Sequence, residues 1–331
     1  MKVTREMVAK RAGVCKQTVS CYLNNSRNVS KELSEKIENA IAELNYVPNL
    51  LAKGLSTKKT NTLAVICGEI SNPNYTETIA GIESAANRLD YSVMIFDTHN
   101  NIDRIINQII ARRIDGVIIL DFKDRIGATN FARLDENGTH IVLTHSAGDI
   151  SNRYMQLEPN YRSGIEETLL TLQSLGHKNV EMLSCFPDNY VLDKRLPFFL
   201  EFHEKIFGKK AAFIAPERPV KASLENGRLL ARRFLEGKHN ATAVLTTNDL
   251  MAIGAIKEFN SCGMGQNISV IGFDNVLYAE YLTPSLSSIG YNKSEYGDRL
   301  FRMFLSKANG AESKVEYVDT RLFRRNSLGG I

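Results

Sequence analysis

The sequence predicts two kinds of structure in one chain: a small all-α unit at the N-terminus, followed by an α/β core of doubly wound parallel sheets. Two observations support this division. Residues 4–24 contain two short helical patterns joined by a tight turn, and from residue 62 onward short β-branched runs alternate with longer amphipathic stretches. With 331 residues, of which 43% are hydrophobic and 24% charged, the chain is long enough for two or three domains.

The N-terminal unit begins with a helix-turn-helix pattern. Thr4 is a favourable N-cap, and the apolar stripe of the first helix is formed by Val8, Ala9 and Ala12. Gly13 supplies the positive φ that the turn requires. The packed side of the second helix is formed by four residues: Val14, Thr18, Val19 and Leu23. Four others face outward: Lys16, Gln17, Ser20 and Cys21. Taken alone, the pattern also fits an ordinary helix corner.

A third helix and a concentration of positive charge complete this unit. Residues 29–49 predict a helix that is capped by Ser30 and interrupted at Pro48; its core positions are Ile37, Ile41 and Leu44. Residues 1–60 hold eleven Lys and Arg against five Asp and Glu, a net charge of +6, which leaves −2 for the remaining chain. Positive charge confined to a helix-turn-helix is typical of a phosphate-binding surface.

The core pattern consists of strands and helices in alternation. Eight apolar runs predict strands: 62–68, 91–98, 116–120, 140–145, 179–185, 211–215, 242–249 and 268–275. Helical segments lie around 77–90, 102–113, 128–137, 162–175, 196–206, 224–236, 249–260 and 293–306. Such runs are typical of parallel strands buried on both faces, and their number predicts two halves that divide near residue 160. The ligand crevice of such sheets lies beyond the carboxyl ends of the strands.

Both parts of the chain resemble one family. The turn, the two Val-Ser pairs and the motif AIAELNYVPN (40–49) resemble the headpiece and hinge of the lactose-repressor (LacI/GalR) family. Residues 61–328 resemble the effector-binding core of the same family, which shares its fold with periplasmic sugar-binding proteins of type I. Three segments carry this likeness: SLGHKNVEML (174–183), TAVLTTNDLMAIGAIKEF (242–259) and ISVIGFDNVLYAEYLTPSLSSI (268–289).

The resemblance implies a domain organisation. Residues 1–46 would form the DNA-binding headpiece, 47–60 a hinge helix and linker, and 61–330 the effector-binding and dimerisation core. Within the core, the chain would cross three times between two subdomains. The first subdomain would comprise 61–159 plus 291–320, and the second 160–290 plus 321–328.

The resemblance also implies a ligand-responsive repressor that binds a palindromic DNA operator as a homodimer. The implied DNA contacts are Thr4, Lys16, Gln17, Thr18, Ser20, Cys21, Asn24, Asn28 and Leu55. Lys16, Gln17 and Cys21 fall on base-reading positions, the last of which is often arginine in the family. Alternatively, Cys21 turns toward the headpiece core and Asn24 or Arg27 reads that base. Residues 49–56 would become a helix on DNA, with Leu55 wedged into the minor groove.

The implied effector is a small polar metabolite, such as a sugar or sugar derivative. Its expected contacts are Asn74, Tyr75, Asp121, Arg195, Asn248 and Asp274. An arginine fork and carboxylates suit the recognition of polar groups. The alternative is that each acidic residue only caps the following helix, a role that suits Asp249. The identity of the effector, and whether it acts as inducer or corepressor, stays open.

Several residues depart from the family pattern. Met7 replaces the acidic residue that closes the first capping box, and Cys15 replaces the serine that caps the recognition helix. Two further departures lie in the core: Phe198 and Thr144. The aromatic residue that stacks on ligands in many relatives falls on Ala222, and the chain has no Trp. A stacking ring would therefore have to come from Phe213 or Tyr75.

Other function classes fit the sequence less well. Residues 64–73 contain a single Gly and no GxGxxG, and the chain has neither a GxSxG nor an HExxH motif, which disfavours an α/β enzyme. The six histidines show no ligand or triad spacing. A transport-type solute-binding protein would lack a use for residues 1–60 and would need an export signal.

Composition sets further expectations. There is no apolar run of about 18 residues and no signal-like N-terminus, so we expect a cytoplasmic location without membrane contact. The five cysteines are scattered and have no metal spacing, so we expect reduced thiols, no structural zinc and no cofactor. The segment RLFRRNSLGGI (321–331) lacks a leucine heptad, which favours a dimer over a tetramer.

Overall fold

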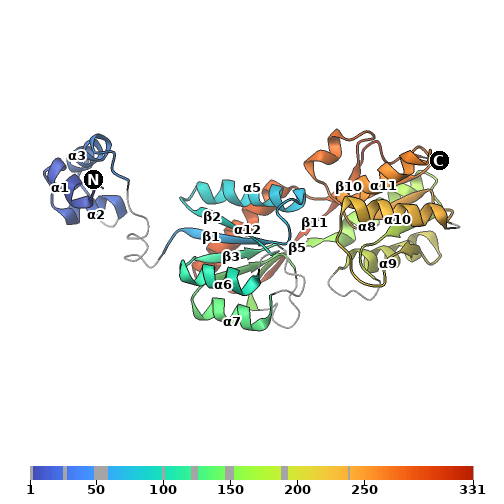
Figure 1. Cartoon of the computed structure of the whole chain (residues 1–331), viewed down its shortest axis with the longest axis horizontal. Helices are drawn as coiled ribbons and strands as arrows, with labels where there is room; N and C mark the ends of the chain where they lie inside the picture. The colour runs from blue at the N-terminus through green and yellow to red at the C-terminus, as the bar shows by residue number, and fades with distance from the viewer. Residues whose placement is uncertain are drawn as a thin grey trace.

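The computed structural model describes residues 3–24, 28–47, 59–98, 101–120, 126–145, 153–187, 193–237 and 239–330, except for the side chain of Asn24. These residues form an N-terminal helical headpiece and two α/β subdomains, each built around one six-stranded sheet (Figure 1). No helix in the described part of the chain is long and apolar enough to cross a membrane.

The headpiece consists of α1 (Arg5–Ala12), α2 (Lys16–Asn24) and α3 (Lys31–Glu43). The predicted caps are confirmed: Thr4 Oγ1 accepts a hydrogen bond from the Met7 N–H, and Ser30 Oγ accepts one from the Leu33 N–H, each at 3.4 Å. Gly13 ends α1 with φ of 68°. The buried core consists of Val8, Ala9, Ala12, Val19, Ile37, Ala40 and Tyr46.

The first sheet is entirely parallel, in the order β11-β5-β4-β3-β1-β2. Its strands are β1 (Thr62–Cys67), β2 (Ser92–Asp97), β3 (Gly116–Ile119), β4 (His140–Leu143), β5 (Met155–Asn160) and β11 (Val315–Asp319). Apolar side chains cover both faces of the sheet. One face packs on α5 (Pro73–Asn87) and α12 (Lys293–Ala308), and the other on α6 (Ile102–Ala111) and α7 (Ala128–Glu136).

The second sheet has the order β12-β10-β9-β8-β6-β7 and is parallel except for its β12 edge. Its strands are β6 (Val180–Leu183), β7 (Ala212–Ile214), β8 (Ala243–Thr246), β9 (Ser269–Asp274), β10 (Ser287–Gly290) and β12 (Arg321–Phe323). Helices α8 (Tyr161–Ser174) and α9 (Arg195–Phe207) cover one face. Helices α10 (Leu224–Glu236) and α11 (Asp249–Ser261) cover the other, and the short helix η2 (Leu277–Tyr281) follows β9.

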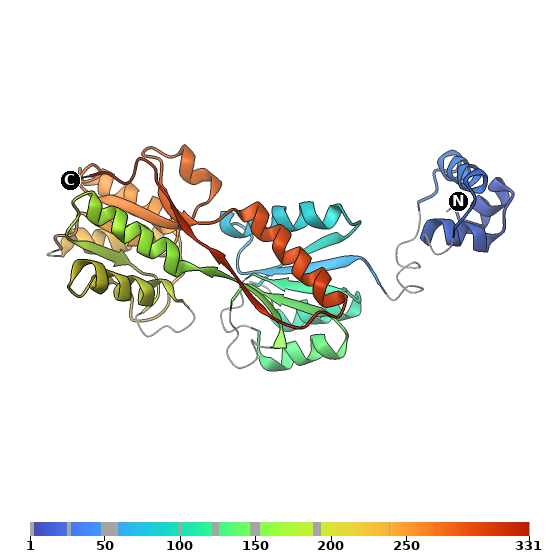
Figure 2. The ribbon, with the colours of Figure 1, turned by 180° about the vertical axis from the view of Figure 1, so that it is seen from behind.

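The chain passes between the two sheets after β5, between β10 and α12, and after β11. Figure 2 shows these connections from behind, where β5 and β11 run toward the second sheet. The ends of these strands are tied together, because Thr320 Oγ1 donates a hydrogen bond to the Asn160 carbonyl at 2.8 Å. The two subdomains are therefore joined along one side, which leaves the carboxyl ends of their strands facing each other.

The structure differs from the predicted elements in four strands and one helix. The eight predicted runs omit β5, β10, β11 and β12, because these strands contain polar residues or a proline instead of continuous apolar runs. Helix α5 begins at Pro73 and not at residue 77, since the Asn72 side chain accepts from the Asn74 N–H at 3.0 Å and caps it. The start at Pro73 brings Asn74 and Tyr75 onto the first turn of this helix.

Candidate functional site

The first candidate site is the outward face of α2. Lys16 and Gln17 are exposed, whereas Thr18, Ser20 and Cys21 are partly buried. Cys21 is not part of the described headpiece core, although its neighbour Tyr22 packs there and donates to Glu38 Oε1 at 2.6 Å. Thr4 and Asn28 are exposed. The Asn24 side chain, Arg27 and the predicted hinge with Leu55 lie outside the described residues.

The N-terminus of α2 is capped by a thiol. Cys15 Sγ accepts a hydrogen bond from the Thr18 N–H at 3.4 Å and lies 3.0 Å from Thr18 Oγ1. These hydrogen bonds lower the pKa of the exposed Cys15 thiol. Cys15 therefore takes the capping position that serine usually holds, and it anchors the start of α2 in place of that serine.

The second candidate site is a cavity of about 460 Å³ between the carboxyl ends of the two sheets. Five of the six predicted effector contacts line it: Asn74, Tyr75, Arg195, Asn248 and Asp274. The sixth, Asp121, lies outside the described residues, although the preceding Leu120 lines the cavity. The first sheet and α5 contribute one wall and the second sheet the other, as expected for a crevice at strand ends.

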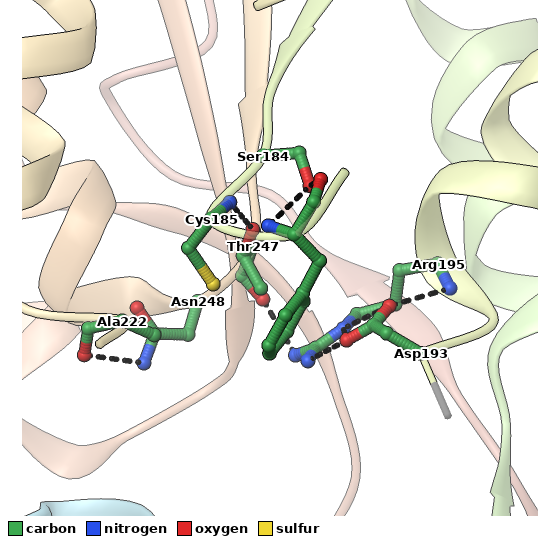
Figure 3. Close-up of polar contacts among 8 residues, drawn as sticks. Ser184, Cys185, Asp193, Arg195, Ala222, Thr247 and Asn248 are labelled. Atoms are coloured by element: carbon green, nitrogen blue, oxygen red, sulfur yellow. Dashed lines mark hydrogen bonds and ion pairs between the residues drawn. The ribbon is translucent and has the colours of Figure 1, made fainter. Parts of the chain in front are cut away.

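Arg195, the first residue of α9, is held in place by Asp193 and a backbone carbonyl. Its Nε donates to Asp193 Oδ2 at 2.9 Å, and its Nη1 donates to the Thr247 carbonyl at 2.6 Å. Figure 3 shows both contacts. Burial opposes the charge of Arg195, but the Asp193 carboxylate prevails and holds the pKa of Arg195 well above its usual value. The guanidinium is therefore a permanently charged donor whose charge is matched from within the protein.

The loops beside Arg195 are braced by local hydrogen bonds (Figure 3). The Cys185 N–H donates to Thr247 Oγ1 at 2.9 Å, which links the loops after β6 and β8. Ser184 Oγ donates to the Phe186 carbonyl at 2.7 Å and so shapes the turn that places Phe186 on the cavity wall. These contacts preorganise the wall of the second subdomain, which limits the entropic cost of binding a ligand.

The side chain of Asn248 makes two hydrogen bonds, one of which caps α11. The expectation that Asp249 caps this helix is therefore wrong. The Asn248 side chain is the cap, since it accepts from the Met251 N–H at 3.0 Å. Its Nδ2 also approaches the Ala222 carbonyl at 3.4 Å. Asp249 is fully buried and accepts from the Val276 N–H at 2.8 Å and from Ser288 Oγ at 2.6 Å. Asp249 therefore braces the loop after β9 and is not among the described residues that line the cavity.

Asp274 ends β9 in an unusual environment. Its φ of 105° is a backbone conformation that side chains rarely adopt, and such outliers cluster at functional sites. Burial raises the pKa of Asp274, while Lys293 and Arg195 oppose that shift. Lys293 is buried, and its Nζ lies 3.9 Å from the centre of the Tyr291 ring without a hydrogen-bond partner in the described structure. Lys293 and Arg195 thus supply positive charge that favours the charged form of Asp274.

Aromatic rings line the cavity, and one of the two expected positions is among them. The expectation that Phe213 supplies a stacking ring is wrong, because Phe213 packs against the core of the second sheet and is not among the described lining residues. Tyr75 does line the cavity. So do Tyr161, Tyr291 and Tyr296, and Tyr296 donates its hydroxyl to the Leu157 carbonyl at 2.6 Å. Ala222 also lines the cavity. The aromatic rings of the cavity therefore come from elements other than the loop that holds Ala222.

Sequence reasoning missed several lining residues. They include Glu69, Thr98, His145, Tyr161, Phe186, Lys221, Tyr291 and Tyr296. Glu69, Thr98, His145 and Tyr291 lie just beyond strands, so the strand-end rule could have found them. Asp193 was also missed, although its position two residues before Arg195 is a usable signal. Asn74 was found, and its Oδ1 is a buried acceptor without a partner among the described residues.

The arrangement suits hydrogen-bonded recognition of a small molecule. No group of His, Cys, Asp and Glu in the described residues could hold a metal ion. Donors and acceptors from both walls converge on one space, with Arg195 and Asn248 on one side and Asn74 and Tyr75 on the other. A ligand bound there would contact both subdomains at once.

Comparisons with known proteins agree with this geometry. Residues 6–49 match the bacterial regulatory proteins of the lacI family, and residues 170–328 match the periplasmic binding protein-like domain. Catabolite control protein A of Priestia megaterium is 26% identical over 99% of this chain and 100% of its own length. The HTH-type transcriptional repressor PurR of Serratia proteamaculans is 28% identical over 97% of this chain and 95% of its own length.

A solved structure shows the same fold over the whole chain. The lac repressor dimer bound to operator and the anti-inducer ONPF superposes with a TM-score of 0.82, at 24% identity, over 99% of each chain. A helix-turn-helix headpiece joined to such a core defines a ligand-responsive, DNA-binding transcriptional regulator. The resemblance to the LacI/GalR family seen in the sequence is thus confirmed, since residues 6–49 match the lacI family and nearly the whole chain aligns with repressors and control proteins of that kind.

Proposed function

We propose that this regulator represses transcription by binding a palindromic operator as a homodimer and that a small neutral polar metabolite, such as a sugar, controls it from the cavity. The carrying observation is the cavity itself, which joins hydrogen-bonding side chains of both subdomains around one space of about 460 Å³. A ligand in this position stabilises one relative arrangement of the subdomains and so biases the spacing of the paired headpieces.

The charges in the cavity support a neutral effector. Arg195 is paired with Asp193, and Lys221 Nζ lies 2.7 Å from a Glu69 carboxylate oxygen. Among the described lining residues, each Lys or Arg thus already has a carboxylate partner. A phosphate group would add negative charge beside these carboxylates, whereas the hydroxyl groups of a sugar can add hydrogen bonds to both pairs without added charge.

On the headpiece, we propose that Lys16 and Gln17 read two bases in each half-site and that Cys21 contributes only an apolar contact. The remaining assigned contacts, which include Asn24 and Leu55, follow from the family pattern.

No catalytic step is part of this function. A transport role makes no use of the headpiece, and operator binding requires the protein to act in the cytoplasm.

A thermal-shift screen tests the proposal on the whole protein. Neutral sugars, their phosphate esters, nucleosides and purine bases would each be added at millimolar concentration. A ligand at a hundred times its Kd raises the free energy of unfolding by about 2.7 kcal/mol. We expect at least one neutral sugar to raise the melting temperature and to change operator affinity in a gel-shift titration. Stabilisation by phosphorylated compounds alone would contradict the neutral-effector assignment.

A further inference from the structure

Three carboxylates of the first subdomain meet hydrogen-bond donors of the second across the cleft. Lys221 Nζ lies 2.7 Å from both carboxylate oxygens of Glu69. The Leu277 N–H donates to Glu77 Oε1 at 2.9 Å. Lys194 Nζ lies 3.4 Å from Glu158 Oε2. In all three contacts the first subdomain supplies the acceptor and the second supplies the donor.

Of these three contacts, the pair of Glu69 and Lys221 bears most directly on the separation of the two subdomains. Both residues line the cavity, and they come from loops after β1 and before α10 that no sheet joins. Glu69 sits in the turn before α5, where Ser71 Oγ also donates to its Oε1 at 2.6 Å. Glu69 belongs to the first subdomain and Lys221 to the second. Their ion pair can therefore form only when the two walls of the cleft are close together.

We propose that Glu69 and Lys221 are the closing pair of the cleft. Their ion pair stabilises the closed arrangement of the two subdomains, and so sets how far an effector must shift the equilibrium between the closed and open arrangements. The Glu77 and Glu158 contacts flank this pair. The inference deepens the proposed function, on which its regulatory meaning rests. It also implies selectivity, because an effector whose own charge captured Lys221 or Glu69 would break the pair, whereas a neutral effector leaves it formed.

Exposure to solvent limits the strength of the Glu69–Lys221 ion pair. The Lys221 side chain is 58% exposed and that of Glu69 28%, so solvent and salt screen their attraction. A partly exposed ion pair of this kind changes a two-state equilibrium by about fivefold. That factor is small enough for an effector to override and large enough to measure.

The test measures cleft opening directly, without operator or effector. Spin labels at Arg104→Cys on α6 and Lys210→Cys after α9 report the distance between subdomains by double electron–electron resonance. The full chain is used with the exposed or half-buried Cys15, Cys21 and Cys262 replaced by serine. We expect Glu69→Lys and Lys221→Glu each to lower the ratio of closed to open molecules about fivefold, and the double swap to restore it.

A matched control lies inside the second subdomain. Lys205 Nζ and Glu166 Oε1 form a similarly exposed pair at 2.9 Å between α9 and α8. Reversing either charge should leave the distance distribution unchanged. If a cleft variant does not fold, Glu69→Gln and Lys221→Gln take its place, with the same expected direction. Unchanged distances in the cleft variants, or a double swap that stays open, would overturn the proposal. Failure of the protein to bind any operator would instead refute the proposed function and leave these distances interpretable.

Discussion

At the scale of single residues, Arg195 shows how the site is prepared before a ligand arrives. Its side chain is only 14% exposed, and that of Asp193 is 8% exposed. Such a buried pair contributes little net stability, but removing one partner leaves the other as an uncompensated buried charge. Arg195 is therefore both a candidate ligand contact and part of the local structure, and substitutions must separate the two roles.

Removing Arg195 should destabilise the core by about 3 kcal/mol, because the Asp193 carboxylate is left buried without its partner. We expect the double variant Arg195→Ala, Asp193→Ala to recover most of this loss while still failing to respond to effector. Urea unfolding measures the first quantity, and operator titration with the ligand found by the thermal-shift screen measures the second. As a control, Lys314→Ala removes a partly exposed pair with Glu316 and should change neither. A double variant as unstable as Arg195→Ala would contradict this account.

Cys21 leads to a prediction about operator sequence. It is partly buried on the outward side of α2, and a thiol lacks the two parallel donors with which arginine reads guanine. Cys21→Arg should add a guanine at one symmetric position in each half-site, worth about 1–3 kcal/mol of discrimination. Selection of operators from a random pool with both proteins compares the two sequences. An identical consensus would mean that another residue reads this base.

At the scale of secondary structure elements, the beginning of α2 decides how the proposed recognition surface is presented. The helix has only nine residues and no acidic residue in its first turn, so the cap is its main local support at that end. The Thr18 N–H reaches Cys15 Sγ at 3.4 Å, which is a weak hydrogen bond to sulfur. The helix start is therefore anchored, but less firmly than serine would anchor it.

Exchanging the cap should change operator binding in two directions. Cys15→Ala removes the acceptor and should destabilise the start of α2 by about 1 kcal/mol, with a corresponding loss of operator affinity of roughly fivefold. Cys15→Ser supplies a stronger acceptor and should bind at least as tightly as the original protein. Fluorescence anisotropy with a labelled operator measures both variants. Equal affinity of the alanine and serine variants would show that the cap does not limit binding.

At the scale of the whole molecule, apolar side chains remain uncovered on one part of the second subdomain. Leu277, Tyr278 and Tyr281 of η2 are 58%, 61% and 76% exposed. Large exposed apolar side chains gathered on one short helix are typical of an interface between subunits. Because a twofold dimer uses the same patch on both subunits, we propose this patch as the contact of the proposed homodimer.

A charge in this patch should separate the subunits. Tyr281→Asp places a carboxylate in the proposed contact, and we expect light scattering at micromolar concentration to show a monomer for this variant and a dimer for the original protein. Operator affinity should fall at least tenfold, because one headpiece contacts only one half-site. Tyr317→Asp on β11 is the control, since Tyr317 is 59% exposed outside the patch. A dimer that survives Tyr281→Asp would place the contact elsewhere.

How much of the candidate site could be predicted depended on where each residue lies in its element. Arg195, Asn248 and Asp274 were predicted from the family resemblance, and they stand at the beginning of a helix or the end of a strand. Lys221 and Phe186 lie in irregular loops, so no periodicity points to them. Their position on the cavity wall depends on loop hydrogen bonds such as the one from Ser184.

The helix-turn-helix with its caps at Thr4 and Ser30, the alternation of strands and helices, and the family resemblance could all be predicted from the amino-acid sequence. Capping and hydrophobic periodicity are local signals, since they involve residues close together in the chain. In contrast, the folded molecule was needed to show that β5 pairs with β11 across more than 150 residues, and that Glu69 faces Lys221 over the cleft. Such contacts join residues that are distant in the chain, and their side chains meet only when both sheets are folded and brought together.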